Sequence, residues 1–429
     1  MSRLKIAVVH HHRSFFPLDL YAELRPVADV LWVFCEAPDN ARPARLPARL
    51  GTVVDIYGLD LDAAADAIRT HEPDGIVTYV DDTLVLTAEL ADRLGLPFHT
   101  PDAARTFVDK RRQRAAFDAA GVPGPRSWPL ARGLARAALE RLSAELPYPC
   151  VVKPAEGSGS RGINCLSGPT DVLDLLDGDK LATDHLIEEY LPDDPSCPAW
   201  IASYLSVESI VTDDRISHAA VTGRFPLAEP FRETGNIVPA AIPAEQVGPL
   251  LELVERAARA LDTRAAVIHT EIKLTPSGPK VIEINGRLGG RPPFVLNSVS
   301  GVNLFQATCK VAAGQDAHVD GLAACTGVGF WLMIQPPVSA RRVAEVAGIE
   351  DVRALPGVDS VEVFVRPGDA VDWAEGTDAR VATIRGRCPD HAALEATVAA
   401  IRAALVLRYD DPTADVPAHH ALDSAMTAP

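Results

Sequence analysis

Short apolar runs alternate with longer amphipathic segments over the first hundred residues of the chain. The runs have the length and β-branched content of buried strands, and the segments between them place apolar residues at helical spacing. The expected strands are Leu4–His10, Val30–Cys35, Thr52–Gly58 and Gly75–Val80, and the expected helices are Leu18–Arg25, Leu61–His71 and Thr83–Leu94. This order predicts a parallel sheet flanked by helices. The turn after the first strand reads HHHRSFF; without a GxGxxG pattern, it disfavours a dinucleotide site.

The middle of the chain has a different pattern, with a long basic helix followed by hairpins. The helix is expected over Asp102–Gly121, because a glycine ends it and prolines follow. The further expected elements are a strand, glycine-rich loop and strand within Pro147–Leu166, a strand over His185–Leu191, a hairpin over Ser203–Phe225 that turns at Asp213–Asp214, a helix over Ala244–Leu261 and a hairpin of Ala266–Leu274 with Lys280–Asn285.

A third pattern begins near Ala324, with three strands and a closing helix at His391–Leu405. The strands are expected at Gly327–Ile334, Ser360–Arg366 and Ala379–Arg387. The chain therefore divides into an α/β domain at 1–100, a core at 101–323, an α+β domain at 324–410 and a frayed tail at 411–429. Within the core we expect a small subdomain at about 125–190 and a larger sheet at about 191–323.

Composition and charge narrow the class of protein. The 429 residues include 41 Lys and Arg against 58 Asp and Glu, a net charge of −17, which argues against a nucleic-acid partner. The sequence has no apolar run of membrane-spanning length and no signal-peptide pattern, so a cytoplasmic protein without membrane contact is expected. The seven cysteines are scattered and form no CxxC pair, which disfavours a disulfide framework or a zinc knuckle.

A lysine and a glycine-rich loop lie together in the segment VVKPAEGSGSRGI, residues 151–163. Lys153 ends a buried strand, and the loop after it contains Ser158, Gly159 and Ser160. Glycines let backbone N–H groups approach phosphate oxygens closely, and the lysine adds a point charge. The segment lacks the GK[ST] pair of a Walker A loop. Its two interpretations are a phosphate-binding loop and a plain hairpin connection.

The hairpin at His269–Gly290 carries regularly spaced polar residues in an apolar setting. Because strand residues two apart share a face, Glu283, Asn285 and Arg287 point the same way. Glu271 on the partner strand can face them, and together the carboxylates and the amide are suitable ligands for Mg²⁺. The alternative is an exposed hairpin with charged outer residues.

Two further segments carry little weight when read alone. The first is LIEEYL, which ends in Glu188, Glu189, Tyr190 and Leu191. Its backbone offers the donor and the acceptor that pair with an adenine edge. The alternative interpretation is a strand end with solvated acidic side chains. Lys110 lies in the basic helix, whose charged face is ordinarily just solvated.

The order of these motifs resembles the ATP-grasp superfamily over roughly residues 101–314. The run E-I-N-x-R after an HxE strand is the most specific element, and PFRETGNIVPA, residues 230–240, is similar to the L-amino-acid ligases and related dipeptide synthetases. The resemblance implies an ATP-grasp fold, with 125–190 as the lid and 191–323 as the catalytic sheet. Residues after Ala324 resemble the C-terminal domain of that group.

The resemblance implies a carboxylate–amine ligase that works through an acyl phosphate. ATP would lie between two sheets, with Mg²⁺, expected as two ions, or Mn²⁺ in its place. The implied ATP contacts are Lys110, Lys153, Ser158, Gly159, Ser160 and the backbone from Glu188 through Glu189 and Tyr190 to Leu191. The implied metal ligands are Glu271, Glu283 and Asn285, the catalytic residues are Arg287 and Glu233, and the substrate residues are Glu233, Asn236, Arg287, Gly290 and Arg291.

Three positions depart from the pattern of that group. Asn236 stands where the dipeptide synthetases have histidine, and Arg291 stands where a large apolar residue lines the amino-acid pocket. Tyr204 lies near the place of an acid that meets the ribose. We expect Glu233 to meet an amino group of the carboxylate donor, and Arg291 either to meet a polar group of that substrate or to pair with Glu233 and brace the loop.

Several alternatives remain open from the sequence. Within the same fold, the alternative is an ATP-dependent carboxylase of the biotin-carboxylase or purine-biosynthesis type, against which the ETGN segment argues. A nucleotide-binding regulator without turnover is disfavoured by the intact Glu271, Glu283 and Arg287. The expected partners are a small-molecule carboxylate and an amine, with a homodimer as the default assembly. His10, His11 and His12 form a metal site, a substrate loop or a structural loop.

Overall fold

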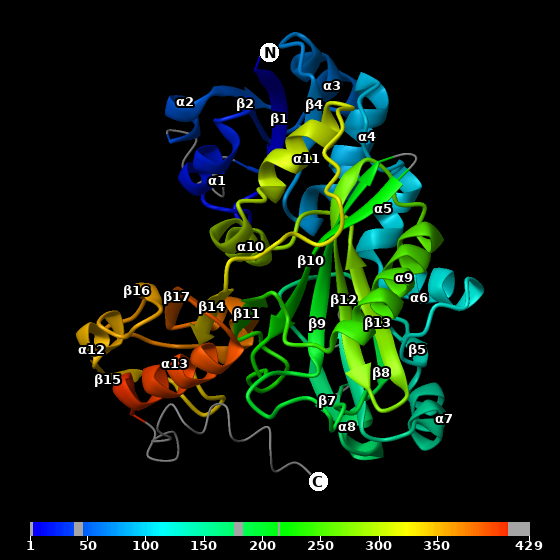
Figure 1. Ribbon diagram of the computed structural model, residues 1–429. Coiled ribbons are helices and arrows are strands. Elements are labelled where there is room, and N and C mark those ends of the chain that lie inside the picture. Colours follow the sequence, from blue (N-terminus) through cyan, green and yellow to red (C-terminus); the bar gives the residue numbers. More distant parts are fainter. Residues whose placement is uncertain (1–2, 38–45, 176–182, 213–214, 411–429) are drawn as a thin grey trace.

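The computed structural model describes residues 3–37, 46–175, 183–212 and 215–410. Its N-terminal part is a four-stranded parallel sheet in the order β3-β2-β1-β4 (Figure 1). The strands are β1 Leu4–His10, β2 Ala28–Phe34, β3 Thr52–Asp55 and β4 Gly75–Val77. The predicted parallel sheet is therefore confirmed. On one face, α3 (Leu61–Arg69) and α4 (Leu84–Leu94) cover the apolar side chains of the strands.

The other face of this sheet is covered partly by a helix from much later in the chain. α1 (Pro17–Leu24) lies there beside α11 (Leu304–Ala312), and α10 (Pro292–Ser300) adjoins them (Figure 1). Ile6 and Val8 of β1 are fully buried in the same apolar cluster as Phe305 of α11. The N-terminal sheet is thus tied directly to the segment that follows the polar hairpin.

The lid is a separate four-stranded sheet in the order β5-β8-β6-β7. Its strands are β5 Ser127–Leu130, β6 Cys150–Pro154, β7 Asn164–Leu166 and β8 His185–Glu189, and its helices are α7 Arg136–Glu145 and α8 Pro169–Leu173. Leu139 and Val172 from the two helices pack on Val152 and Ile187 of the sheet. The glycine-rich loop joins β6 to β7 at one end of this layer.

The prediction of one long basic helix is wrong, because the chain breaks at Asp109. The helices are α5 (Pro101–Val108) and α6 (Lys110–Ala119), and Asp109 between them has extended φ and ψ of −106° and 107°. The Asp109 carboxylate accepts the backbone N–H of Arg111 at 2.9 Å and so caps α6. The Lys110 N–H donates to the carbonyl of Ala155 at 2.9 Å, which places Lys110 beside the glycine loop.

The largest sheet in the described part of the chain has eight strands, in the order β13-β12-β9-β10-β11-β14-β17-β16. The strands are β9 Tyr204–Thr212, β10 Arg215–Arg224, β11 Gly235–Val238, β12 Ala266–Thr275, β13 Gly278–Asn285, β14 Val328–Ile334, β16 Val358–Val363 and β17 Ala382–Cys388. Both predicted hairpins are present, although the turn at 213–214 lies outside the described residues. β11 pairs with β14, so this sheet runs unbroken past residue 324.

The remaining elements complete the two ends of the large sheet. Helix α9 (Ala244–Ala260) packs on β12 and β13, and α13 (His391–Ala404) packs on the sheet at β17. The others are α2 Pro47–Leu50, α12 Ile349–Arg353, β15 Val343–Ala347 and β18 Val406–Tyr409, with the 3₁₀ segments η1 Asp81–Thr83 and η2 Trp373–Ala379. None of the helices described has both the length and the apolar content to cross a bilayer. The predicted tail at 411–429 lies outside the described residues.

His99 links the N-terminal part to the polar hairpin through a neutral imidazole. It is 2% exposed, its Nε2 lies 2.8 Å from the carbonyl oxygen of Gly286, and its Nδ1 lies 3.4 Å from the backbone N of Arg264. One nitrogen donates and the other accepts, so a second ring proton would face the N–H of Arg264. Burial lowers the pKa of His99 from 6.5 to about 4.

We predict that His99 makes the unfolding free energy fall as the pH falls from about 6.5 to about 4, because the unfolded chain takes up the ring proton first. In His99→Gln, the loss of stability between pH 7 and pH 5 should be smaller than in the wild type by about 2 kcal/mol. Urea unfolding at the two pH values measures this difference. Equal losses in the two proteins would contradict the assignment.

Candidate active site

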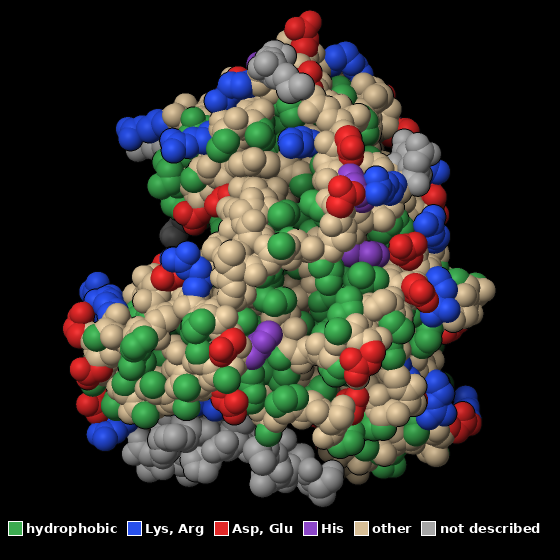
Figure 2. Space-filling view, viewed as in Figure 1, with side chains coloured by type: hydrophobic (Ala, Val, Ile, Leu, Met, Phe, Trp, Pro, Cys, Tyr) green, Lys and Arg blue, Asp and Glu red, His purple; other side chains and the backbone are tan. Residues whose placement is uncertain are grey.

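A cavity of about 1530 Å³ opens between the lid and the large sheet and reaches both the N-terminal part and the C-terminal α+β part. Its wall includes the glycine loop, the end of β8, the polar hairpin and η2. On the outer face in Figure 2, acidic and basic side chains are interspersed and lie mostly around the outline. Most of the charged residues singled out in the sequence line this cavity.

Lys153 lies in the lid beneath the glycine loop and is 4% exposed. Its Nζ is 2.7 Å from one oxygen of Glu188, whose other oxygen accepts Arg114 Nε at 2.7 Å. Burial lowers the pKa of Lys153 more than Glu188 raises it. Burial would raise the pKa of Glu188, but Arg114 and Lys153 outweigh it and hold that pKa low. The side chain of Glu188 is thus an internal counter-ion.

Lys110 approaches the same space from the start of α6. Its Nζ donates to the carbonyl of Gly157 at 2.7 Å and lies 3.5 Å from Glu283 Oε2. The glycine loop turns here through positive φ at Gly157 (132°) and Gly159 (71°), and also at Ser160 (58°). A side chain at the two glycine positions would be strained, which accounts for the glycines in the motif. Two lysines and a tightly turned loop therefore adjoin one another.

The end of β8 lies along the cavity wall with its backbone partly engaged. The N–H groups of Glu189 and Tyr190 donate to the carbonyls of Arg126 (2.9 Å) and Pro149 (3.3 Å). The carboxylate of Glu189 is held by Arg126 and Lys280 at 2.8 and 3.0 Å. Tyr190 and Leu191 also line the cavity, so the segment meets the cavity through these two residues and its backbone.

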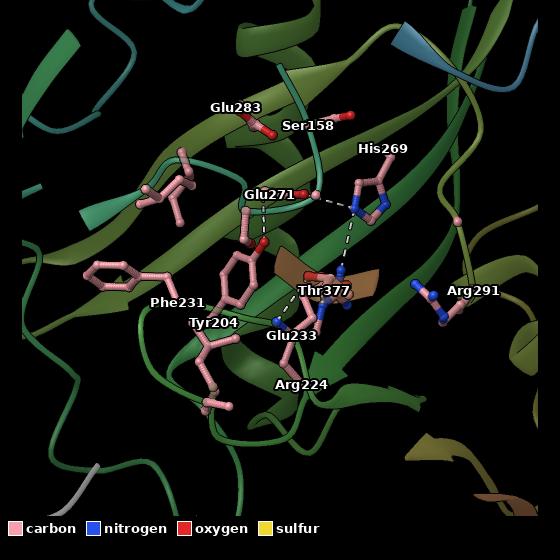
Figure 3. Close-up of a pocket in the computed structure, with 18 of the residues that line it drawn as sticks. Ser158, Tyr204, Arg224, Phe231, Glu233, His269, Glu271, Glu283, Arg291 and Thr377 are labelled. Carbon is pink, nitrogen blue, oxygen red and sulfur yellow. Dashed lines mark hydrogen bonds and ion pairs between the residues drawn. The ribbon is translucent and has the colours of Figure 1, made fainter. Parts of the chain in front are cut away.

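The carboxylates of the polar hairpin meet as the sequence predicts. Glu271 of β12 stands opposite Glu283 of β13, and Asn285 stands opposite His269. Glu271 and Glu283 line the cavity (Figure 3). Their side chains are 17% and 18% exposed. Two partly exposed carboxylates on the cavity wall, with the buried amide of Asn285 two residues along β13 from Glu283, are a donor set that fits Mg²⁺.

A buried network behind Glu271 was missed in the sequence. Tyr204 donates its hydroxyl to Glu271 at 2.5 Å, and His269 Nε2 lies 3.4 Å from the same carboxylate. His269 Nδ1 is 2.7 Å from Glu208, which is fully buried. Burial lowers the pKa of His269, but Glu208 and Glu271 outweigh it and raise that pKa to about 9. The available signal was the period of two that puts Tyr204 and Glu208 on one face of β9.

Arg224 connects this network to the loop that carries Glu233. The guanidinium is 1% exposed, with its Nε 3.1 Å from Glu233 and its Nη2 3.4 Å from His269 Nε2 (Figure 3). Asn236 is buried behind it, and with its amide oriented so that the oxygen faces the guanidinium, this oxygen accepts Arg224 Nε and Nη1, both at 3.1 Å. Glu233 therefore pairs with Arg224, and the alternative in which Glu233 pairs with Arg291 is not the arrangement in the structure.

Arg287 reaches across to the N-terminal part of the chain. Its Nη2 lies 2.5 Å from Asp81 in η1 and 3.2 Å from Asn285 Oδ1. Asp81 was missed in the sequence, because nothing local relates η1 to a hairpin some two hundred residues later. Through its contact with Asn285, the guanidinium of Arg287 lies beside the expected metal ligands.

Arg291 lies at the first turn of α10 and lines the cavity. Among the described residues no hydrogen bond or ion pair engages its guanidinium. Burial lowers its pKa, as does the neighbouring Arg380, while Glu233 and Asp378 act in the opposite direction. Gly290, Phe294 and Trp331 line the same cavity. Figure 3 shows the side chain of Arg291 on the far side of Arg224 from Tyr204.

The three histidines at the end of β1 and just after it are not among the residues that line the cavity. His10 is buried, whereas His11 Nε2 and His12 Nδ1 lie 3.3 and 2.6 Å from one oxygen of Glu36. The ligand atoms of His11, His12 and Glu36 lie within 4.8 Å of one another. The Glu36 carboxylate also accepts the backbone N–H of His12 at 2.8 Å. This bond stabilises the turn after β1, as the structural-loop interpretation requires.

Comparison with protein families gives three matches along the chain. Residues 30–98 match the family model of an ATP-grasp N-terminal domain, residues 107–291 match that of an ATP-grasp domain, and residues 337–410 match that of L-amino acid ligase C-terminal domain 2. The order of the three follows the order of parts expected from the sequence.

Individual relatives agree with these matches. The chain is 30% identical to carnosine synthase 1 of Gallus gallus over 270 residues, which are 57% of this chain and 28% of that protein. It is 27% identical to alanine–anticapsin ligase of Bacillus subtilis (strain 168) over 272 residues, 58% of this chain and 56% of that one. The chain thus spans less than two thirds of these relatives.

A solved structure shows the same fold over nearly the whole chain. The L-amino acid ligase from Bacillus licheniformis superposes with a TM-score of 0.74 at 20% identity. The superposition covers 96% of this chain and 100% of that one, and so includes all three parts.

We predict that Glu188→Gln destabilises the protein by about 3 kcal/mol, because it leaves Lys153 and Arg114 buried without their counter-ion. Glu189→Gln is the matched control on the same strand, and it should cost less than about 1 kcal/mol since Arg126 is well exposed. Urea unfolding of both variants checks the difference. Equal losses would show that Glu188 is not the internal counter-ion.

Proposed function

The chain belongs to the ATP-grasp superfamily, and from this we propose that it is an ATP-dependent carboxylate–amine ligase. The reaction would join an amino acid or small carboxylic acid to an amine, through an acyl phosphate, with release of ADP and phosphate. The observation that carries the proposal is the approach of Lys110 to Glu283, at 3.5 Å, beside the glycine loop. A cation for phosphate and a carboxylate for metal face the same space there.

We assign the nucleotide contacts from the positions of the lysines and from which backbone N–H groups are not already bonded within the protein. Lys110 and Lys153, together with the loop of Ser158, Gly159 and Ser160, would hold the phosphates. The amides of Glu189 and Tyr190 already donate within the protein, so we assign the backbone donor for adenine to Leu191. Glu188 serves indirectly, since its carboxylate holds Lys153 in place.

Magnesium would be held by Glu271, Glu283 and Asn285, whose oxygens suit a hard cation. A divalent ion bound there supplies charge neutralisation for the transferring phosphoryl group. The protein's own part is to keep these carboxylates ionised and fixed. Tyr204 and His269 do this for Glu271, because both engage its carboxylate and His269 helps to lower its pKa to about 2.

The chemistry requires positioning more than covalent help. A carboxylate is a poor acyl donor at neutral pH, and transfer of a phosphoryl group to it creates a leaving group. Arg287, fixed by Asp81, would steady the charge of the tetrahedral species when the amine displaces phosphate. Glu233, held by Arg224, would meet the donor's amino group. No nucleophilic cysteine or serine is needed.

Two observations favour a ligase over an ATP-dependent carboxylase. The C-terminal part matches an L-amino acid ligase domain, and the loop of Glu233 is ordered against it through Gln335. The deciding experiment is a phosphate-release screen over pairs of amino acids and small carboxylic acids, with the product mass measured. Bicarbonate-dependent ATP turnover without amide formation would favour the carboxylase, and no release with any pair would reject the ligase.

We predict that Glu283→Gln lowers turnover to less than a tenth of the wild-type rate at saturating Mg²⁺, because it removes a ligand charge and keeps the shape. Its melting temperature should stay close to that of the wild type, since Glu283 is partly exposed and its nearest cation is 3.5 Å away. Glu345→Gln, far from the cavity on β15, is the control and should keep full activity. Retention of more than a tenth of the rate would remove Glu283 from the metal site.

We further predict that Arg291 selects a carboxylate donor with a polar or acidic side chain, because a guanidinium in the cavity gains from a partner. Arg291→Leu should raise KM for such donors by about tenfold and favour apolar donors, with ATP affinity unchanged. Arg291→Lys keeps the charge and should keep the preference. An unchanged donor profile with lowered stability would make Arg291 a structural residue.

A further inference from the structure

The 3₁₀ segment η2 extends from the C-terminal α+β part to the cavity wall. Trp373, Thr377 and Asp378 line the cavity wall, and Figure 3 shows Thr377 at its centre, beside Glu233 and Arg224. The helical turn is interrupted at Gly376, where φ is 70° and ψ is −138°. This break directs the next residues toward two loops that belong to other parts of the fold.

On one side, η2 contacts the glycine loop of the lid. The backbone N–H of Thr377 donates to the carbonyl of Gly159 at 3.1 Å. A Cβ at Gly376 would lie 2.3 Å from that same oxygen, so the two backbones meet too closely for a side chain. Arg161 Nη1 also lies 3.5 Å from Asp378 Oδ2. The backbone contact dominates, because this ion pair is partly exposed and weak.

On its other side, η2 contacts the loop that carries Glu233. Thr377 Oγ1 accepts the backbone N–H of Glu233 at 3.3 Å. Gln335 donates its amide to the carbonyls of both residues, at 3.0 Å to Thr377 and 2.8 Å to Glu233. Thr377 and Gln335 are 5% and 3% exposed. These buried contacts hold Thr377 against the loop that carries Glu233, which is called the substrate loop below.

The contacts continue from Glu233 to the polar hairpin. Arg224 Nε lies 3.1 Å from Glu233, Arg224 Nη2 lies 3.4 Å from His269 Nε2, and that nitrogen lies 3.4 Å from Glu271. A continuous chain of polar contacts therefore joins the glycine loop to Glu271, one of the expected metal ligands. Thr377 is the link that bridges the lid and the substrate loop in this chain.

We propose that Gly376 and Thr377 are positioning residues, which hold the glycine loop and the substrate loop in one register during catalysis. The proposal rests on the proposed ligase function. Phosphoryl transfer requires the phosphates and the donor carboxylate to be aligned, and the acyl phosphate must then be kept from water. When the loops separate, water attacks the acyl carbon, phosphate leaves, and the donor carboxylate is regenerated without amide formation.

The first test compares Gly376→Ala with Gly321→Ala. The two glycines have nearly equal φ, 70° and 72°, but a Cβ at Gly321 meets nothing within 4 Å. Both variants therefore place an alanine at a positive φ near 70°, and only Gly376→Ala puts a Cβ against the carbonyl of Gly159. We expect Gly376→Ala to raise KM for ATP about tenfold, the effect of one lost hydrogen bond, and to release more phosphate than amide. Gly321→Ala should retain both wild-type values.

A second pair of variants separates the two sides of the contact. Thr377→Val keeps the shape and the backbone N–H but removes the acceptor for Glu233, so it should raise KM for the donor more than KM for ATP. Thr377→Ser restores the hydroxyl and should restore the donor KM. Failure of the serine variant to rescue would assign Thr377 a packing role and overturn its part in the proposal.

Hydrogen exchange of the segment 155–163 gives a readout that does not depend on activity. We expect faster exchange there in Gly376→Ala than in Gly321→Ala, with equal exchange in β12. Equal exchange and equal ratios of phosphate to amide in the two variants would overturn the proposal, even for a proven ligase. Faster exchange in a protein that releases no phosphate with any pair would uphold the contact and reject the ligase function instead.

Discussion

The Glu188 carboxylate is almost excluded from water, and the arrangement of the cavity depends on how its charge is balanced. Lys153 from β6 and Arg114 from α6 both lie 2.7 Å from it. A charge at this depth is tolerated only with partners in good geometry. The requirement holds α6 against the lid sheet, so Lys110 at the start of α6 is held over Gly157 and near Glu283.

The same principle operates on the opposite wall. His269 contacts Glu208, Glu271 and Arg224, and Arg224 in turn pairs with Glu233. Each ionised group has a neighbour of opposite charge, so the metal-type carboxylate and the substrate loop are positioned by one network. Arg291 stands outside it: in the described part of the chain its guanidinium has no partner. That difference is the reason why we propose Arg291 for substrate recognition, whereas Arg224 and Arg287 are held by protein acids.

Three distant parts of the chain supply one site, and their connections explain how. Helix α11 packs on the N-terminal sheet, which ties the end of the polar hairpin to η1 and lets Asp81 reach Arg287. The pairing of β11 with β14 extends the large sheet into the C-terminal part. η2 can then reach back to Gly159 and Glu233. The lid contacts the rest through its glycine loop and α6, the elements that face the cavity.

The sequence by itself determined the elements and the local chemistry, because periodicity and loop composition act over a few residues. The parallel strands, the two hairpins, the facing of Glu271 and Glu283, and the lysine with its glycine loop were all readable in this way. The break at Asp109 was not, since a contact with Ala155 competes there with helix propensity. Three interactions were decided only by tertiary structure. They are the ion pair of Asp81 with Arg287, the ion pair of Glu233 with Arg224, and the contacts of Thr377 with two loops. Asp81 and Arg287, like Thr377 and Gly159, lie far apart in the chain, and Glu233 meets Arg224 only because the loop between them folds back. Buried charges and backbone groups select such partners by proximity in the fold, which no local pattern encodes.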